Sequence, residues 1–142
     1  MKGAIRSVAA VIAGFVAASV VMMAVESLNG KILYPELAKL AAGVSDRDVV
    51  RDILAHAPLG AFLVVLFGWS LGSVAGGFVA AWIASRSPVR HAMILGGLLT
   101  LAGIANNLMI PPPLWFCVVS LVVFIPAAYA GGRLAPHSAA VR

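Results

Sequence analysis

The stretch PLGAFLVVLFGWSLGSVAGGFVAAWIA, residues 58–84, decides the fold because it runs for 27 residues without a charged side chain. About 20 helical residues cross the roughly 30 Å hydrocarbon core of a bilayer, so this stretch is long enough for a membrane-spanning helix. Three further apolar stretches lie at about 7–28, 91–110 and 114–132. The sequence therefore predicts an all-α, polytopic membrane four-helix bundle.

The composition leads to the same class of protein. The 142 residues are 62% hydrophobic and 11% charged, with a mean hydropathy of +1.04, whereas soluble domains are about 25% charged. We expect one transmembrane domain over residues 1–142, with the lipid bilayer as its partner. The net charge of +5 could suit a nucleic-acid binder. The basic residues form no run and lack interleaved aromatics, so we expect no nucleic-acid partner.

The first apolar stretch could be a signal peptide, because Lys2 and Arg6 precede it. Its apolar core runs for about 18 residues, longer than the usual 7–15, and no A-x-A cleavage site follows before Glu26. We expect a retained helix.

The orientation follows from the rule that Lys and Arg collect in short cytoplasmic flanks. The outer loop, residues 29–57, contains as many acidic as basic residues, and 110–114 is uncharged. We predict both termini in the cytoplasm. The abundance of Ala, Gly, Val and Arg suggests a bacterial inner membrane. The flanks on the predicted cytoplasmic side carry only positive charges: Lys2, Arg6, Arg86, Arg90, Arg133 and Arg142.

The outer loop is predicted to contain a short amphipathic helical segment. Pro35 suits the first turn of a helix that Gly43 ends. Ser45 and Asp48 form an S-x-x-D start for a second helix, which lies on the outer leaflet or covers the bundle. The apolar face of this second helix consists of Val49, Val50, Ile53 and Leu54.

Glycines at four-residue spacing mark a packing face on the second span. Gly68, Gly72 and Gly76 form a glycine zipper, and small residues at this spacing let helix backbones approach closely in lipid. The face serves either the bundle itself or a contact with a second copy or a partner membrane protein.

Glu26 is the main candidate for function, because it is the only acidic residue inside a predicted span and intramembrane carboxylates are costly. At about 1.5 Å per residue it lies roughly 30 Å from Arg6, near the outer edge of the bilayer. Asn106 and Asn107 fall in nearly the same layer, and His56 could join it. We predict an outward-opening polar cleft in which these four residues bind a ligand or ion.

Two alternatives remain open for this layer. The Glu26 carboxylate could reach headgroup water or pair with Lys31 or His56. The two asparagines could serve only as hydrogen-bonding links between helices.

The sequence contains no signature for a catalytic residue, a cofactor or a metal. One Glu, one His and two Asn without ligand spacing do not make a metal site. The single cysteine, Cys117, excludes an internal disulfide. The string G-W-S-L-G at 68–72 lies inside a helix, not at the strand-to-helix turn of a G-x-S-x-G hydrolase.

Several features together resemble uncharacterised small four-span bacterial inner-membrane proteins. They are Glu26 ending the first span, Tyr34-Pro35 after it, the glycine-rich second span and PLWF at 113–116. This resemblance implies a fold but no activity. Small multidrug resistance transporters also have four helices and a Glu in the first, but theirs lies near mid-helix and their loops are short.

Two functional hypotheses follow. The first is a non-enzymatic protein that binds a partner protein, lipid or small ligand through the outer polar layer. The second is a small transporter or channel in which Glu26 binds a proton or cation. Transport needs a polar path from Glu26 past Ser70 and Ser73 to the cytoplasm, and binding does not.

Overall fold

The computed structural model describes residues 2–84 and 86–136, and in these residues every regular element is a helix. Four of the helices are long and apolar enough to cross a membrane, which confirms the prediction of an all-helical chain with four candidate spans. Arg142, one of the charges used to orient the chain, lies outside the described residues. The long helices are α1 (Lys2–Leu28), α4 (Leu59–Ile83), α5 (Pro88–Met109) and α6 (Leu114–Leu134).

The first helix extends beyond the predicted stretch at both ends. It begins at Lys2, and its outer end continues as a π-helical turn, η1 (Asn29–Leu33). The helical run stops at Tyr34 because proline, here Pro35, disfavours helical backbone angles in the residue before it. The polar residues just past Leu28 therefore belong to the same continuous helix as Glu26.

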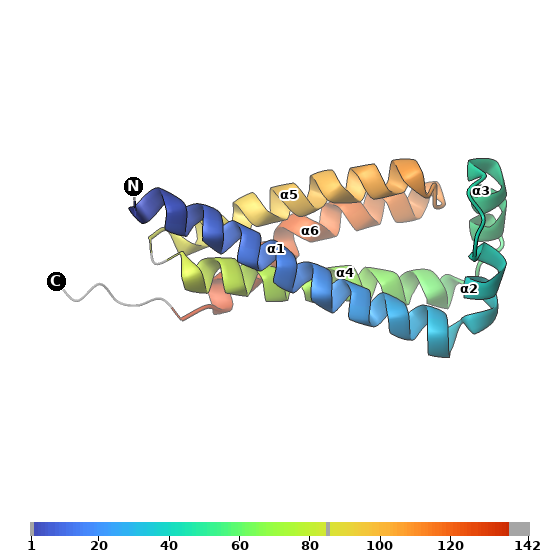
Figure 1. Cartoon of the computed structure of the whole chain (residues 1–142), viewed down its shortest axis with the longest axis horizontal. Helices are drawn as coiled ribbons and strands as arrows, with labels where there is room; N and C mark the ends of the chain where they lie inside the picture. Colours follow the sequence, from blue (N-terminus) through green and yellow to red (C-terminus); the bar gives the residue numbers. More distant parts are fainter. Residues whose placement is uncertain (1, 85, 137–142) are drawn as a thin grey trace.

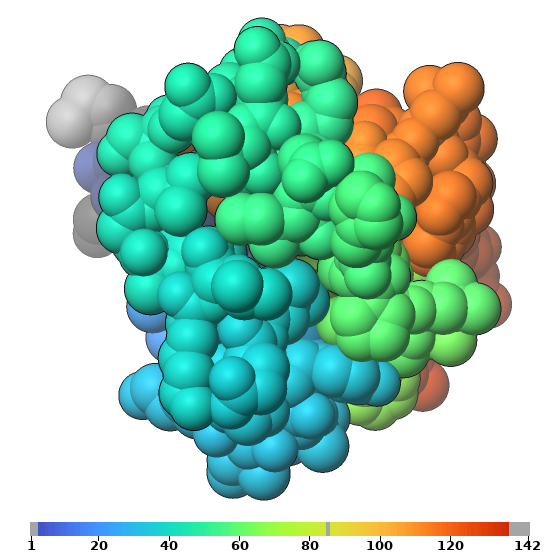
Figure 2. Space-filling model, turned by 90° about the vertical axis from the view of Figure 1, so that its right-hand side faces the viewer, coloured from blue at the N-terminus to red at the C-terminus, as the bar shows by residue number. Residues whose placement is uncertain are grey.

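The four long helices lie side by side, with the start of α1 and the end of α6 at the same end of the bundle (Figure 1). The opposite end carries two short helices, α2 (Pro35–Ala41) and α3 (Arg47–Ala55). Gly43, between them, has a φ of 76°, which glycine adopts without strain. Figure 2 shows this end of the molecule, with α2 and α3 above the end of α1, the start of α4 beside them, and the α5–α6 turn uncovered at the upper right.

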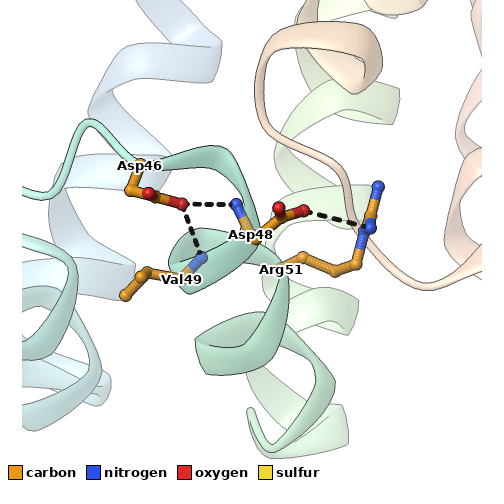
Figure 3. A network of polar contacts seen from close by, with 4 residues as sticks. All are labelled: Asp46, Asp48, Val49 and Arg51. Carbon is orange, nitrogen blue, oxygen red and sulfur yellow. Dashed lines mark hydrogen bonds and ion pairs between the residues drawn. The ribbon is translucent and has the colours of Figure 1, made fainter.

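The N-cap of α3 differs from the predicted one. The capping residue is Asp46, not Ser45, and its carboxylate accepts hydrogen bonds from the backbone N–H groups of Asp48 at 2.9 Å and Val49 at 3.2 Å (Figure 3). Aspartate is a strong N-cap, and its charge also complements the positive end of the helix. Arg51 binds Asp48 on the next turn at 3.3 Å.

Gly68, Gly72 and Gly76 face α1. A Cβ added to Gly72 would lie 2.8 Å from the backbone oxygen of Ala18, and one added to Gly76 would lie 2.6 Å from that of Gly14. At Gly68 the added carbon would meet the side chain of Val25. The backbones of α1 and α4 approach this closely only because these positions lack side chains.

A second close contact, between α4 and α6, was not foreseen from the sequence. Gly77 packs against the backbone of Ala128, and Gly131 packs against the backbone of Val74. Glycines thus bring both α1 and α6 close to α4. The core between the helices is apolar and consists of Ala18, Phe62, Trp69, Ala80, Leu95, Leu99, Phe116 and Phe124.

Candidate functional site

A cavity of about 310 Å³ lies at the end of the bundle that carries α2 and α3. Residues from both short helices and from all four long helices line it. Its walls are mostly apolar, with Phe62, Trp69 and Phe116 as the aromatic part. The polar side chains that line it are Glu26, Asn29, Tyr34, Asn106 and Asn107.

The carboxylate of Glu26 is held by the indole of Trp69. The Nε1–H group of Trp69 donates a hydrogen bond to Oε1 of Glu26 at 2.6 Å. Trp69 is only 6% exposed, and an indole can donate but not accept. This contact links α1 to α4 across the close glycine packing and fixes the carboxylate at the wall of the cavity.

Asn29, in the π-helical turn, is the most buried polar side chain of the cavity, with 9% of its surface exposed. Its Nδ2 donates to the backbone oxygen of Ala61 at 3.2 Å. That bond fixes the orientation of the amide, because only the NH₂ group can donate to a carbonyl. The other end of the amide, Oδ1, is buried and accepts no hydrogen bond within the described residues.

Asn107 repeats this arrangement on the other side of the cavity. Its Nδ2 donates to Oγ of Ser120 at 3.2 Å, and the Ser120 hydroxyl donates to the backbone oxygen of Cys117 at 3.0 Å. Since the single proton of Ser120 points to Cys117, Ser120 must accept from Asn107. Oδ1 of Asn107 is therefore a second buried acceptor to which the described part of the chain supplies no donor.

The short helices complete the wall. Tyr34, Leu37 and Ala38 line the cavity from the α2 side, and Leu54 and Ala57 line it from the α3 side. The hydroxyl of Tyr34 lies directly against the backbone of Gly60, leaving no room there for a side chain. The start of α4 thus fixes the position of Tyr34.

The predicted site residues divide into two groups. Glu26, Asn106 and Asn107 line one cavity. His56 lies elsewhere, in a groove between α2 and α3, where its Nδ1 lies 2.9 Å from the backbone oxygen of Asp52 and its side chain is 78% exposed. The hydrogen bond to Glu26 comes from Trp69, not from an asparagine.

Two residues of the cavity, Asn29 and Trp69, are not among the predicted site residues. Asn29 is three residues beyond Glu26, one helical turn along the same face, but the predicted span ended before it. Trp69 follows Gly68 in the packing motif, and the glycine spacing gives no indication that its indole N–H is a hydrogen-bond donor to the cavity. The sequence does contain one signal for this hydrogen bond, since it places a carboxylate and an indole N–H at the same depth in the membrane.

The two serines that follow Trp69 bond within α4. Ser70 and Ser73 donate to backbone oxygens of their own helix, each at 2.7 Å. Trp69 stacks on Phe124 with ring centroids 5.4 Å apart. The two midplane hydroxyls that a polar path would need are therefore already bonded to α4.

No family model matches the chain, and searches of curated proteins and of solved structures give no match either. Within the described residues, His, Cys, Asp and Glu side chains form no group of three that could hold a metal ion.

Proposed function

We propose that this chain is a multi-pass protein of the bacterial inner membrane, with both termini in the cytoplasm, that binds a small ligand in the cavity around Glu26 without reacting with it. The observation that carries this proposal is the pair of buried acceptors, Asn29 Oδ1 and Asn107 Oδ1, at the same cavity as Glu26. A buried polar atom without a partner costs about 1–3 kcal/mol. A ligand with matching donors would remove that cost.

The charge bias of the sequence supports this orientation. The described residues from the end of α4 to the first turn of α5 include Arg86 and Arg90 and no acidic residue, whereas the end with α2 and α3 is balanced in charge. In this orientation the cavity lies in the outer half of the membrane. Ligand would then enter from the outer leaflet or from the water beyond it.

The shape of the site favours a small molecule over a partner helix. Ligand sites in proteins are concave, mostly apolar and about 300–1,000 Å³ in volume, with a few polar groups that fix orientation. The cavity, at about 310 Å³ with its few polar side chains, has these properties. A partner helix would need an extended groove instead.

The alternative, transport of a proton or cation by Glu26, receives less support. It requires a polar route from the cavity to the opposite end of the bundle. Trp69 stacks on Phe124, and the hydroxyls of Ser70 and Ser73 donate to backbone oxygens of α4. Binding requires no such route.

Filling the cavity tests the proposal. Ala38 lines the cavity from α2 and is exposed, so Ala38→Trp should occupy the space without disturbing the spans. Ala42→Trp, also exposed but outside the cavity, is the control. Native mass spectrometry of protein purified in mild detergent should find bound small molecules on the wild type and on Ala42→Trp, but not on Ala38→Trp. Bound molecules of equal abundance on all three proteins, or on none, would disprove the proposal.

A further inference from the structure

We infer that the cavity takes a primary ammonium group carried by a small apolar body. This inference rests on the proposed function, since it names the chemical class of the ligand for the same cavity. Three properties of the cavity lead to it: the type of its unpaired polar atoms, the sign of its charge and the nature of its walls.

The buried polar atoms without a partner among the described residues are both acceptors. Asn29 and Asn107 each use the NH₂ group for a hydrogen bond within the protein and present a buried Oδ1. Glu26 uses Oε1 for Trp69, and no hydrogen bond to its second oxygen arises from the described residues. A ligand that pairs with these oxygens supplies donors. A primary ammonium has three N–H donors and no acceptor, as the lysine side chain does.

The charge of the cavity is negative. Glu26 is its one ionisable acid, and in the described part of the chain no Lys, Arg or His lines it. Glu26 is an exposed residue, and an opposite charge close to its carboxylate stabilises it. A cationic ligand supplies that charge, whereas an anionic ligand would be repelled.

The walls fit an apolar body of limited size. Phe62 and Trp69 both pack against Phe116, with ring centroids 5.2 and 5.6 Å apart, and aromatic faces attract cations as well as apolar groups. At roughly 30 Å³ per water molecule, the cavity has room for about ten waters. A hexyl-sized body with its ammonium is of this order.

A primary ammonium can come from a free amine or from a phosphatidylethanolamine headgroup. In the headgroup, a phosphate lies close to the ammonium and would be brought toward Glu26 with no basic side chain to bind it. The chemistry therefore favours a free amine. The experiment compares two nanodisc lipids in order to distinguish a free amine from the phosphatidylethanolamine headgroup.

The test uses the wild-type protein in phosphatidylcholine nanodiscs and isothermal titration with four hexyl probes, with empty nanodiscs as the blank. We expect hexylammonium to bind at least tenfold more tightly than 1-hexanol, which lacks the charge, and than hexyltrimethylammonium, which lacks N–H donors. Hexanoate should not bind. Because this series needs no mutation, it does not depend on any variant folding.

Two variants locate the binding. Glu26→Gln can still accept the hydrogen bond from Trp69 but loses the charge, and it should weaken hexylammonium binding at least tenfold. Glu36→Gln is the matched control, because Glu36 is an exposed carboxylate on α2 that does not line the cavity. It should leave the affinity for hexylammonium unchanged.

The outcomes separate this inference from the proposed function. If hexanol or hexyltrimethylammonium binds as tightly as hexylammonium, the inference is wrong while ligand binding stands. The same holds if no probe binds although Ala38→Trp still removes bound molecules in mass spectrometry. If neither experiment shows binding, both proposals fail. Weaker hexylammonium binding in phosphatidylethanolamine nanodiscs would support the ammonium site and assign it to the lipid headgroup.

Discussion

The contact between Glu26 and Trp69 joins two groups that would each be costly alone in a membrane. The indole N–H is buried and has the Glu26 carboxylate as its acceptor. Removing the acceptor leaves that donor unpaired, whereas replacing the carboxylate by an amide keeps an oxygen in place.

We therefore expect Glu26→Ala to lower the free energy of unfolding by about 1–3 kcal/mol and Glu26→Gln to change it much less. Thermal melting in detergent measures the difference. Glu36→Ala, which removes an exposed carboxylate, should melt like the wild type. The double variant Glu26→Ala with Trp69→Phe provides a further check, since its loss should be smaller than the sum of the two single losses. Additive losses would mean that the hydrogen bond does not stabilise the protein.

Part of the cavity could be predicted residue by residue. The rise of 1.5 Å per residue placed Glu26 and Asn107 in one layer, and both line the cavity. The same reasoning failed for His56, because its depth depends on the path of α2 and α3, which hydropathy does not determine. It also could not tell whether the carboxylate accepts a hydrogen bond from an asparagine or from an indole. Depth alone does not determine which sides of two helices pack against each other.

At the level of the elements, the close packing of α1 on α4 makes a prediction about single methyl groups. In Gly72→Ala the new Cβ would lie 2.8 Å from a backbone oxygen of α1, and such overpacking typically costs about 1–3 kcal/mol. Gly97, on α5, has nothing within 4 Å of an added Cβ, so Gly97→Ala should be neutral or slightly stabilising. Melting temperatures in detergent compare the two, and equal values would contradict the packing of α1 against Gly72.

The start of α3 gives a second prediction at this scale. Asp46→Ala should destabilise α3 locally by about 0.5–2 kcal/mol, because the N–H groups of Asp48 and Val49 lose their acceptor. Hydrogen exchange at Val49 and Val50 should accelerate, while Ser45→Ala should leave it unchanged. If exchange is faster in Ser45→Ala instead, Ser45 and not Asp46 is the N-cap of α3.

The elements were easier to predict than their contacts. Hydropathy predicts the three later spans to within a few residues, because each is bounded by proline or charge. The glycine pattern identified the crowded face of α4. It did not reveal that Gly77 and Gly131 bring α6 against another face, because spacing within one helix does not identify the neighbour.

For the whole molecule, the arrangement predicts which segments share a side of the membrane. Cysteines introduced at Ser45 and Ser87 in a Cys117→Ala background lie at opposite ends of the bundle, before α3 and before α5. We expect an impermeant thiol reagent to label Ser45→Cys in intact cells and Ser87→Cys only after the membrane is opened. Labelling of both in intact cells would contradict the four-span topology.

The hydrogen bonds between long helices divide the molecule into two halves along the chain, and this affects how it is made. Trp69 with Glu26, Asn29 with Ala61 and Arg6 with Ile83 all fall within the first 84 residues, whereas Asn107 and Ser120 join α5 to α6. As helices insert before they associate, the first pair can assemble while the ribosome is still synthesising the second. Asn107 and Phe116 reach the cavity only with that second pair. The cavity is therefore completed only after the second pair of helices has been made.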